Sequence, residues 1–568
     1  MCCLYKRRLG KLDPPFDEFV HRGSEYFQKL NYVDGIHRKP ELLIPYSTIY
    51  YSMHECDVDL ENLKEVIQSM LDFGLPIATE DNPYRKMEMR YALQKGCFDH
   101  PLPPLQTLFR SSSLYEVPPA LFLRLDDVYS LTHIIFYLTD FGFSKSRNPN
   151  LVPLRGLIST LLGMYTLERN WDVVAELLLC CNFLNYFPLA TYLTSWSSLI
   201  QAQKTDGSLT DTFFSSEKYE KMDVREKDRY YFEQHYHTTQ LSAAVAFLTD
   251  DGNIIKRDTL GAKPRYSLPD CGKPIEKAYN WILRTYDDQS ERLSLSSLLH
   301  VLLGQWIWSN FVGDHYLERS QNSYMRIHDK IQRLISSSPA SVNACDPALV
   351  LLAEAILRGF NLRVADFELF ARSSFDSLCS ADNSKPNRAL DLFPVSYLLQ
   401  SMGFQLDMRS PEEEREILPF DCGIGVSEDT LRAIVNYIST ATSFGSRHFR
   451  AYEPQIVDNV RANLTALAYY YLHKYRLDEG FMLIRAMNHS GMKSWKCFRE
   501  AVDFMLAQQR KDGSFGFYRD EIELIRKSEQ GFDPLDKIIL PITVSAMWTL
   551  AEATTDGFSL FNSVRTIL

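Results

Sequence analysis

The apolar positions of this chain recur at helical spacing along most of its length. Residues 60–74 carry one apolar stripe that ends at a glycine, and residues 83–96 begin with proline and end with glycine, the usual asymmetry of a helix. The stripe in residues 60–74 consists of Leu60, Leu63, Val66, Ile67 and Met70. Few segments alternate apolar and polar residues with the period of two that is typical of a strand. The pattern predicts an all-α protein of short helices joined by glycine- and proline-marked turns.

Residues 495–518 show how such a helix is expected to end. Apolar residues at i, i+4, i+7 and i+8 lie on one helical face. These residues are Phe498, Val502, Met505 and Leu506. Gln509 and a turn at residues 511–513 follow, and the glycine of that turn suits the positive φ at which a helix commonly ends. Phe515 and Gly516 then close the motif, which we call the glutamine turn.

The same construction occurs in residues 190–211. Placing Asp206 on Asp512 gives an offset of 306 residues, at which Gln203 falls on Gln509. Further matches at or near this offset are Ser208 with Ser514, Asp172 with Asp478, and Phe141-Gly142 with Phe444-Gly445. Self-similarity at a fixed period is the sequence signature of a repeat architecture. We therefore expect the chain to consist of two related halves.

A helix, the glutamine turn, a loop and a Thr/Ser-rich apolar helix together resemble the repeat of α/α toroids. This fold is found in squalene- and terpenoid-cyclase domains and in protein prenyltransferase β-subunits. The resemblance implies helical hairpins in a closed ring around a central cavity, with the glutamine turn as a structural joint. Residues 190–211 lack the closing aromatic-glycine pair. The chain also lacks the D-x-D-D and D-D-x-x-D motifs of terpene cyclases and the W-C-x-G and C-H-G zinc motifs of lanthionine cyclases, so the resemblance implies a fold but not an activity.

The toroid interpretation predicts four segments. Residues 1–45 are mixed and proline-punctuated, which predicts an N-terminal arm, and residues 46–335 would form a first half-toroid. The Ser/Pro-rich residues 336–347 would be a linker, and residues 348–568 a second half-toroid.

The composition narrows the class of protein. The chain has 568 residues, of which 45% are apolar, and a net charge of −11. This acidic balance argues against nucleic-acid binding, which requires a clustered basic face. The 11 cysteines contain no C-x-x-C pair. They indicate neither a disulfide framework nor a zinc finger, and they suit a reducing compartment, so we expect a cytoplasmic protein.

We also expect no membrane span. The long uncharged run at residues 177–203 is interrupted by asparagines and a proline, which favours two helices and a loop over one spanning helix. The first residues contain no apolar signal segment. Cys2 and Cys3, beside three basic residues, are interpreted as part of an exposed arm, with an acylated anchor as the alternative.

One helix of the first half carries unusual polar residues. His133 and Asp140 are seven positions apart and share a helical face, with Tyr137 between them. The second half has Asn436 and Ser443 near the corresponding positions. A histidine and an aspartate within an apolar helix are costly to bury unless their polar atoms are satisfied. They therefore predict either a functional site or a histidine hydrogen bond, to a carboxylate or to the backbone, that ties two helices together.

A second candidate lies near the start of the helix after the first glutamine turn. His235 and His237 are two residues apart, so they can converge only in an extended or turn conformation. The second half has Pro541 where the first has His237. If the inner helices begin at the same rim, we expect His133, Asp140 and His237 to meet at the cavity.

Two imidazoles and a carboxylate allow three interpretations. They suffice for a divalent metal, zinc first, with an open coordination position, and His235 could substitute as a ligand. Alternatively, they form a metal-free pair in which histidine is the base and aspartate orients it. The third interpretation is purely structural.

The sequence favours an enzyme of natural-product biosynthesis that acts on a hydrophobic or peptide-like substrate in the central cavity. It would catalyse a metal- or acid/base-assisted cyclisation, hydrolysis or transfer, with Tyr137 or Tyr236 assisting. One alternative is a non-catalytic toroid that binds a peptide or partner protein. The other is a toroid glycosidase or polysaccharide lyase, in which Asp126, Asp127 and Asp206 would supply the acid/base pair. Asp126 and Asp127 are better explained as a helix cap, and Asp206 as part of the turn.

Overall fold

The computed structural model describes most of the chain. The described residues are 2–29, 35–36, 38–75, 81–144, 149–210, 214–249, 266–289, 291–313, 315–379, 393–405, 428–447, 449, 454–519, 522–523 and 533–565. Regular structure in these ranges is helical, apart from one isolated β-bridge between Gln509 and Phe515. The predicted all-α class is therefore confirmed. Within the same ranges, no helix combines the length and the apolar character needed to cross a membrane.

The chain divides into two compact units, Met1–Thr259 (unit 1) and Leu260–Leu568 (unit 2). This division differs from the expected linker at residues 336–347. In the structure, these residues continue from α18 (His315–Ser337) through the 3₁₀ helix η6 (Pro339–Ala344) to α19 (Pro347–Gly359) inside unit 2. The expected N-terminal arm also contains regular structure, because α1 (Cys2–Leu9) and α2 (Pro14–Lys29) lie in it.

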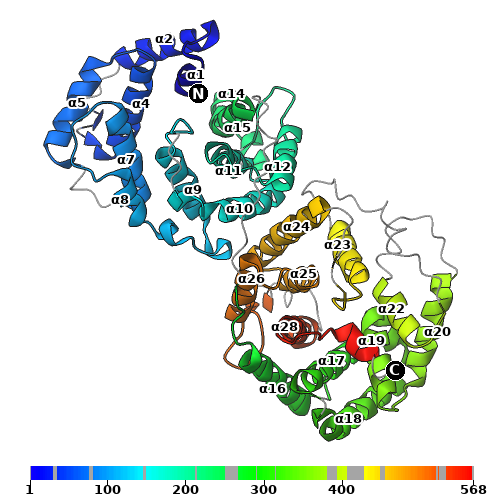
Figure 1. Cartoon of the computed structure of the whole chain (residues 1–568). Helices are drawn as coiled ribbons and strands as arrows, with labels where there is room; N and C mark the ends of the chain where they lie inside the picture. Colours follow the sequence, from blue (N-terminus) through cyan, green and yellow to red (C-terminus); the bar gives the residue numbers. More distant parts are fainter. Residues whose placement is uncertain are drawn as a thin grey trace. The chain divides into compact units, whose positions relative to one another are not determined.

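Unit 1 contains a series of short helices that each bury one face (Figure 1). Besides α1 and α2, its α-helices are α4 (Leu43–Glu55), α5 (Glu61–Asp72), α7 (Pro83–Lys95), α8 (Leu105–Arg110), α9 (Leu125–Leu138), α10 (Leu154–Glu168), α11 (Trp171–Phe183), α12 (Leu189–Gln201), α13 (Ser216–Glu220), α14 (Val224–Glu233) and α15 (Tyr236–Thr249). Its 3₁₀ helices are η1 (Pro40–Leu42), η2 (Ser113–Glu116), η3 (Ala120–Phe122) and η4 (Pro149–Leu151). Helices α4, α7, α9, α11 and α15 pack in succession, each against the next.

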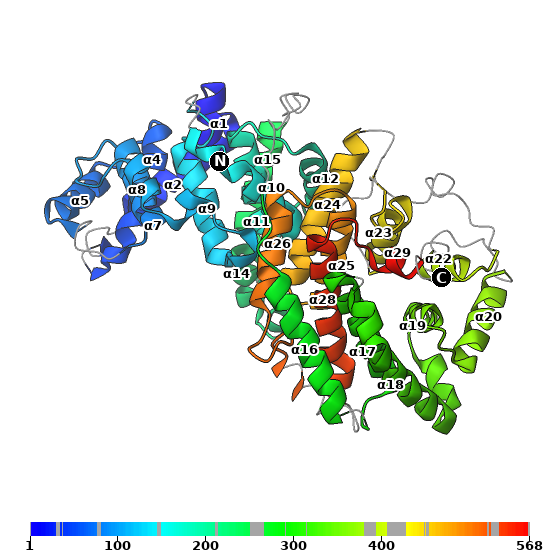
Figure 2. The same ribbon diagram turned by 60° about the horizontal axis from the view of Figure 1, so that its bottom comes forward.

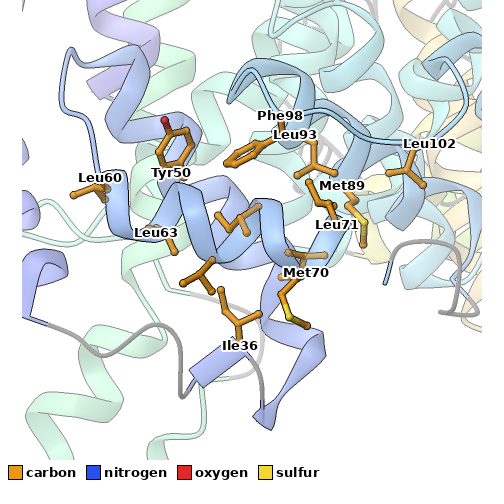
Figure 3. Packing of buried hydrophobic residues seen from close by; sticks show 13 residues of the cluster. Ile36, Tyr50, Leu60, Leu63, Met70, Leu71, Met89, Leu93, Phe98 and Leu102 are labelled. Atoms are coloured by element: carbon orange, nitrogen blue, oxygen red, sulfur yellow. The ribbon is translucent and has the colours of Figure 1, made fainter. Parts of the chain in front are cut away.

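Sequence features explain the start and the packing of these helices. The Asn82 side chain accepts a hydrogen bond from the backbone of Arg85 and caps α7. The apolar stripe predicted in residues 60–74 is buried, with Leu63 and Ile67 at its centre. It forms a core cluster with α4 and α7, in which Leu71 lies beside Met89 (Figure 3).

Unit 2 is likewise helical. Its helices are α16 (Gly272–Gln289), α17 (Leu295–Val312), α18 (His315–Ser337), α19 (Pro347–Gly359), α20 (Ala365–Cys379), α22 (Phe393–Ser401), α23 (Glu428–Ala441), α24 (Pro454–His473), α25 (Leu477–His489), α26 (Lys496–Ala507), α28 (Leu540–Thr554) and α29 (Leu560–Arg565), with the short π-helix η8 (Leu535–Ile539) before α28. Helices α16, α17 and α28 pack against one another and run side by side in Figure 2. Helix α28 also packs against α25.

The glutamine turn has the same hydrogen bonds in both units. Gln203 Nε2 donates to the Gly207 carbonyl over 2.8 Å, and Gln509 Nε2 donates to the Gly513 carbonyl over 3.1 Å. Both glycines have positive φ, +84° and +104°. In each turn the aspartate accepts hydrogen bonds from the backbone and hydroxyl of the serine two residues later, Asp206 from Ser208 and Asp512 from Ser514. The turns are therefore structural, as expected.

The repeat extends beyond these turns. The residues that follow α9 and α23, at 140–142 and 443–445, all have positive φ. Gly142 packs against Phe183 on α11, and Gly445 packs against His489 on α25. Helix α11 contacts α9, α10, α12 and α15, and α25 contacts α23, α24, α26 and α28. The two units therefore share a helical scaffold in which α11 and α25 hold the same place.

Candidate active site

Helix α11 brings two carboxylates into the interior of unit 1. It begins after Asn170, whose side chain accepts a hydrogen bond from the Val173 backbone. Asp172 and Glu176 lie one turn apart on it, and their side chains are 4% and 1% exposed. The helix is otherwise apolar and is packed on several sides. Buried carboxylates are costly unless they are hydrogen-bonded, so their partners define the site.

Asp172 is held by groups from α9 and α15, the two helices that flank α11 (Figure 1). His237 Nδ1 lies 2.8 Å from Asp172 Oδ1, the Thr238 hydroxyl donates to the same oxygen over 2.9 Å, and the Tyr129 hydroxyl donates to Oδ2 over 2.9 Å. Burial alone would raise the pKa of Asp172, but the hydrogen bond and charge of His237, with the hydroxyl hydrogen bonds, outweigh it and lower that pKa. Asp172 is thus an anionic acceptor.

This contact fixes the tautomer of His237. Because an ionised carboxylate can only accept, Nδ1 carries the proton, and Nε2 of the neutral ring carries the lone pair. The side chain of His237 is 46% exposed. An imidazole oriented by a buried aspartate and reached by solvent is the arrangement of a general base.

Glu176 forms a second histidine–carboxylate contact one turn further along α11. His133 Nδ1 lies 3.7 Å from Glu176 Oε2, and it donates to the Tyr129 carbonyl over 2.8 Å. The Thr132 hydroxyl also donates to Glu176 Oε2. Burial raises the pKa of Glu176, and His133 and Thr132 offset this only in part. Glu176 therefore holds a proton more readily than an ordinary glutamate.

A cavity of about 530 Å³ adjoins this cluster. It is lined by residues of α7 and α9 and by the residue that precedes each of these helices: Asn82, Tyr84, Arg85, Arg124, Asp126, Asp127, Tyr129, Ser130 and His133. Tyr129 and His133 therefore belong to both the cavity wall and the buried cluster. The lining is mostly polar, and it carries both charge signs. Asp127 accepts a hydrogen bond from the Arg124 backbone over 3.0 Å and caps α9, as the sequence indicated.

Asp140 is not part of this cluster. Arg7 donates to its two oxygens over 3.0 and 2.6 Å, Tyr91 donates over 2.7 Å, and Lys95 lies 2.9 Å away. Burial opposes ionisation of Asp140, but the hydrogen bonds from Arg7, Tyr91 and Lys95 outweigh it and lower the pKa. Asp140 also lies beyond Leu138, the last residue of α9, and has positive φ, so it does not continue the helical face that carries His133. Asp140 therefore joins α1 and α7 to the end of α9, which corrects its expected place beside the histidines.

The other two predicted residues are enclosed. Tyr137 is buried, its ring packs against Tyr91, and burial raises its pKa. His235 is also buried. Its Nδ1 donates to the Tyr231 carbonyl over 2.7 Å, and its Nε2 accepts from Lys204 over 2.8 Å. Both of its ring nitrogens are therefore used in joining the glutamine turn to α14.

The predicted metal ligands are not assembled as expected. Among the residues that the structure describes, no three His, Cys, Asp or Glu side chains are grouped so that they could hold a metal ion. The set of His133, Asp140 and His237 does not fit such a site, because Asp140 is bound by two cations elsewhere. Zinc binding itself stays a prediction.

The sequence identified the two histidines but missed their carboxylates. Asp172 and Glu176 are the only charged residues of α11, and acidic residues one turn apart in an apolar helix are the same signal that drew attention to His133. Asp172 entered the sequence argument only as a repeat position.

Comparison with known families gives one match. A family model described as "Domain of unknown function (DUF6895)" matches residues 1–247. The match lies within unit 1 and includes His133, Asp172, Glu176 and His237. No curated protein and no solved structure matches the chain.

Proposed function

We propose that unit 1 is an enzyme domain in which His237, oriented by Asp172, acts as a general base. The hydrogen bond of 2.8 Å from His237 Nδ1 to the buried Asp172 carboxylate carries this proposal. Such a base removes a proton from a nucleophile, which suits an acid/base-assisted hydrolysis, cyclisation or transfer. It requires neither the D-x-D-D nor the D-D-x-x-D motif.

The neighbouring groups have distinct roles in this proposal. Tyr129 and Thr238 hold Asp172, and Asp172 holds the ring of His237, so these three are positioning residues. Glu176 retains a proton through burial and adjoins His133, which lines the cavity. This second pair would supply the proton donor that a general-acid step needs.

The cavity lining favours one of the substrate classes that the sequence suggested. Arginine, aspartate, serine and tyrosine side chains surround about 530 Å³. Such a wall suits a small peptide-like substrate better than a hydrocarbon, because an apolar ligand would leave these groups unpaired. We therefore propose a peptide-like substrate. We also propose a role in natural-product biosynthesis and a location in the cytoplasm, as expected from the sequence.

We also propose the α/α-toroid arrangement for the helices. In unit 2, the packing contacts run from α17 to α19, α22, α23, α25 and α28, and α28 packs against α17 again. The succession of α4, α7, α9, α11 and α15 in unit 1 follows the same order. The unit 2 succession closes on α17 and so supports a ring of inner helices in that unit. We propose the same arrangement for unit 1, whereas the sequence suggested one ring formed by both halves.

The test uses a conservative replacement of the base. Wild-type protein and His237→Gln would be incubated with fractionated short peptides and polar metabolites, and masses consumed and formed would be followed by liquid chromatography and mass spectrometry. We expect conversion by wild type and a rate lower by about 10²–10⁴-fold in His237→Gln. His21→Gln is the matched control, since His21 is exposed on α2. Unchanged conversion by His237→Gln would refute the assignment.

Two further outcomes distinguish the alternatives. If native mass spectrometry finds a fraction that binds wild type and both variants equally without conversion, unit 1 is a binding module. Elemental analysis of wild-type protein and of the variants His133→Ala and His237→Ala tests the zinc prediction. If stoichiometric zinc is present in wild type and lost in both His133→Ala and His237→Ala, a metal-assisted mechanism would replace the metal-free one.

A further inference from the structure

Two cysteines meet where α1 lies against the end of α4. Cys3 is on α1, and Cys56 directly follows α4 as its C-cap residue. The two sulfur atoms are 3.8 Å apart, which is within hydrogen-bonding distance for sulfur, and Cys3 Sγ also donates to the Ser52 carbonyl over 3.1 Å. Both thiols are free, and Cys56 is buried. These two residues are 53 positions apart in sequence and adjacent in space.

The pair has the asymmetry of an attacking and a resolving thiol. The hydrogen bond from Cys56 lowers the pKa of Cys3 to about 7, although burial opposes this. The same hydrogen bond, together with burial, raises the pKa of Cys56. Cys2, the neighbouring cysteine, has its pKa raised by burial. Of the three thiols, Cys3 therefore forms a thiolate most readily, and thiolates are the nucleophiles of thiol–disulfide exchange.

We propose that Cys3 and Cys56 are a redox-active dithiol that a low-molecular-weight disulfide, such as oxidised glutathione, converts to an intramolecular disulfide. The Cys3 thiolate attacks one sulfur of the small disulfide, forms a mixed disulfide and releases one glutathione thiolate. That thiolate takes the proton of Cys56, and the Cys56 sulfur then attacks Cys3 Sγ. A second glutathione thiolate leaves. In total, two protein thiols are oxidised and one small disulfide is reduced to two thiols.

The disulfide would secure a helix that is otherwise held by side-chain contacts. No residue of α1 is fully buried. Lys6 pairs with Asp57, Arg7 binds Asp140, and Arg8 lies over the Phe247 ring at 5.3 Å. A covalent bond from α1 to α4 keeps Arg7 at the end of α9, the helix that also carries His133. Oxidation thereby stabilises unit 1 at the end of α9 remote from the cavity.

The experiment equilibrates the full chain in buffers of increasing oxidised-to-reduced glutathione ratio, followed by acid quenching and alkylation. Peptide mapping with fragmentation would locate the bond, because it distinguishes Cys2 from Cys3. We expect the Cys3–Cys56 peptide pair to lose two hydrogens and the melting temperature to rise by roughly 5–10 °C on oxidation. Excess reduced glutathione should reverse both changes.

Matched variants make the result decisive. Cys3→Ser and Cys56→Ser should abolish the cross-linked peptide and the temperature shift, whereas Cys2→Ser should retain both. Mixed glutathione adducts on Cys3 without the cross-link, or a cross-link to Cys2, would overturn the proposal. So would a cross-link that leaves the melting temperature unchanged. Since Cys3 and Cys56 are absent from the catalytic cluster, none of these outcomes depends on the proposed activity.

Discussion

An aspartate at the same helix position has very different partners in the two units. In unit 1, α11 presents Asp172 and Glu176 to histidines that are partly open to solvent, His237 at 46% and His133 at 29% exposure. In unit 2, α25 has Asp478 where α11 has Asp172. Asp478 accepts a hydrogen bond from the Ser545 hydroxyl over 3.1 Å, with no imidazole in that contact.

In unit 2, the polar groups around Glu552 are buried together. Glu552 accepts hydrogen bonds from His489 Nε2, Trp548 Nε1 and the Leu560 backbone over 3.1, 2.8 and 2.8 Å. Arg485 lies over the Trp548 ring at 4.0 Å. His489 is only 7% exposed, so solvent does not reach this cluster as it reaches His237. One scaffold thus holds a solvent-accessible histidine–aspartate pair in unit 1 and a buried histidine–glutamate pair in unit 2.

The largest effect that this contrast between the two units predicts is on catalytic turnover. Asp172→Asn keeps the size of the side chain but removes the charge that orients His237, and the new amide can present a donor to Nδ1. We expect turnover to fall by about 10²–10⁴-fold, as for a base deprived of its orienting carboxylate. Asp478→Asn, the matched change in unit 2, should leave turnover within about twofold. The rates of substrate consumption measured for the proposed function provide the test, and equal losses in both variants would contradict it.

The sealed cluster predicts the largest effect on stability. Glu552→Ala removes the shared acceptor of His489, Trp548 and the Leu560 backbone. We expect unit 2 to lose about 3–5 kcal/mol of unfolding free energy, the usual effect of breaking a buried pair by removing one partner. Hydrogen exchange read by mass spectrometry would report the two units separately. Protection should fall in α25 and α28, and unit 1 should be unaffected; a uniform loss in both units would count against the comparison.

The glutamine turns predict a smaller difference. Both turn glycines have positive φ, so an alanine at either costs about 1–2 kcal/mol. A Cβ on Gly207 would come no nearer than 3.8 Å to a side chain, whereas on Gly513 it would lie 2.2 Å from the Lys277 carbonyl of α16. Gly513→Ala should therefore cost about 1–3 kcal/mol more than Gly207→Ala. Urea unfolding followed by fluorescence measures both variants, and equal midpoint shifts would show that α16 does not press on the turn.

Local patterns in the sequence predicted the helices and the turns. The stripe from Leu60 to Met70 is buried as its spacing indicated, and Gln203 and Gln509 make the turn contacts that their shared context implied. These features depend on residues within a few positions of one another. Periodicity and turn chemistry record such short-range relations.

The site is formed by contacts between residues that are far apart in the sequence. His133 and His237 were found because the second half lacks them, but their partners on α11 lie 43 and 65 positions away in the chain. Asp140 was expected beside the histidines because a spacing of seven residues would put it on the helical face of His133, but α9 ends at Leu138. Its partner Arg7 is 133 residues distant, and spacing on one helix holds no information about that contact.

The smallest expected effect is a difference in how the two carboxylates of α11 change the stability of the protein with pH. The pKa of Glu176 is raised in the folded protein, so its contribution to stability is full below the unfolded pKa of about 4.3 and is lost as pH rises through the folded value. Glu176→Gln cannot ionise, and it should raise the melting temperature at pH 7 by about 3 °C, with the gain disappearing near pH 4. Asp172 has a lowered pKa, so its contribution is present above about pH 3.9 and is lost as pH falls through the folded value. Asp172→Asn should therefore destabilise at pH 7 and less in acid. Melting curves of both variants between pH 3 and 8 measure these opposite slopes, and parallel slopes would show that the two carboxylates share one environment.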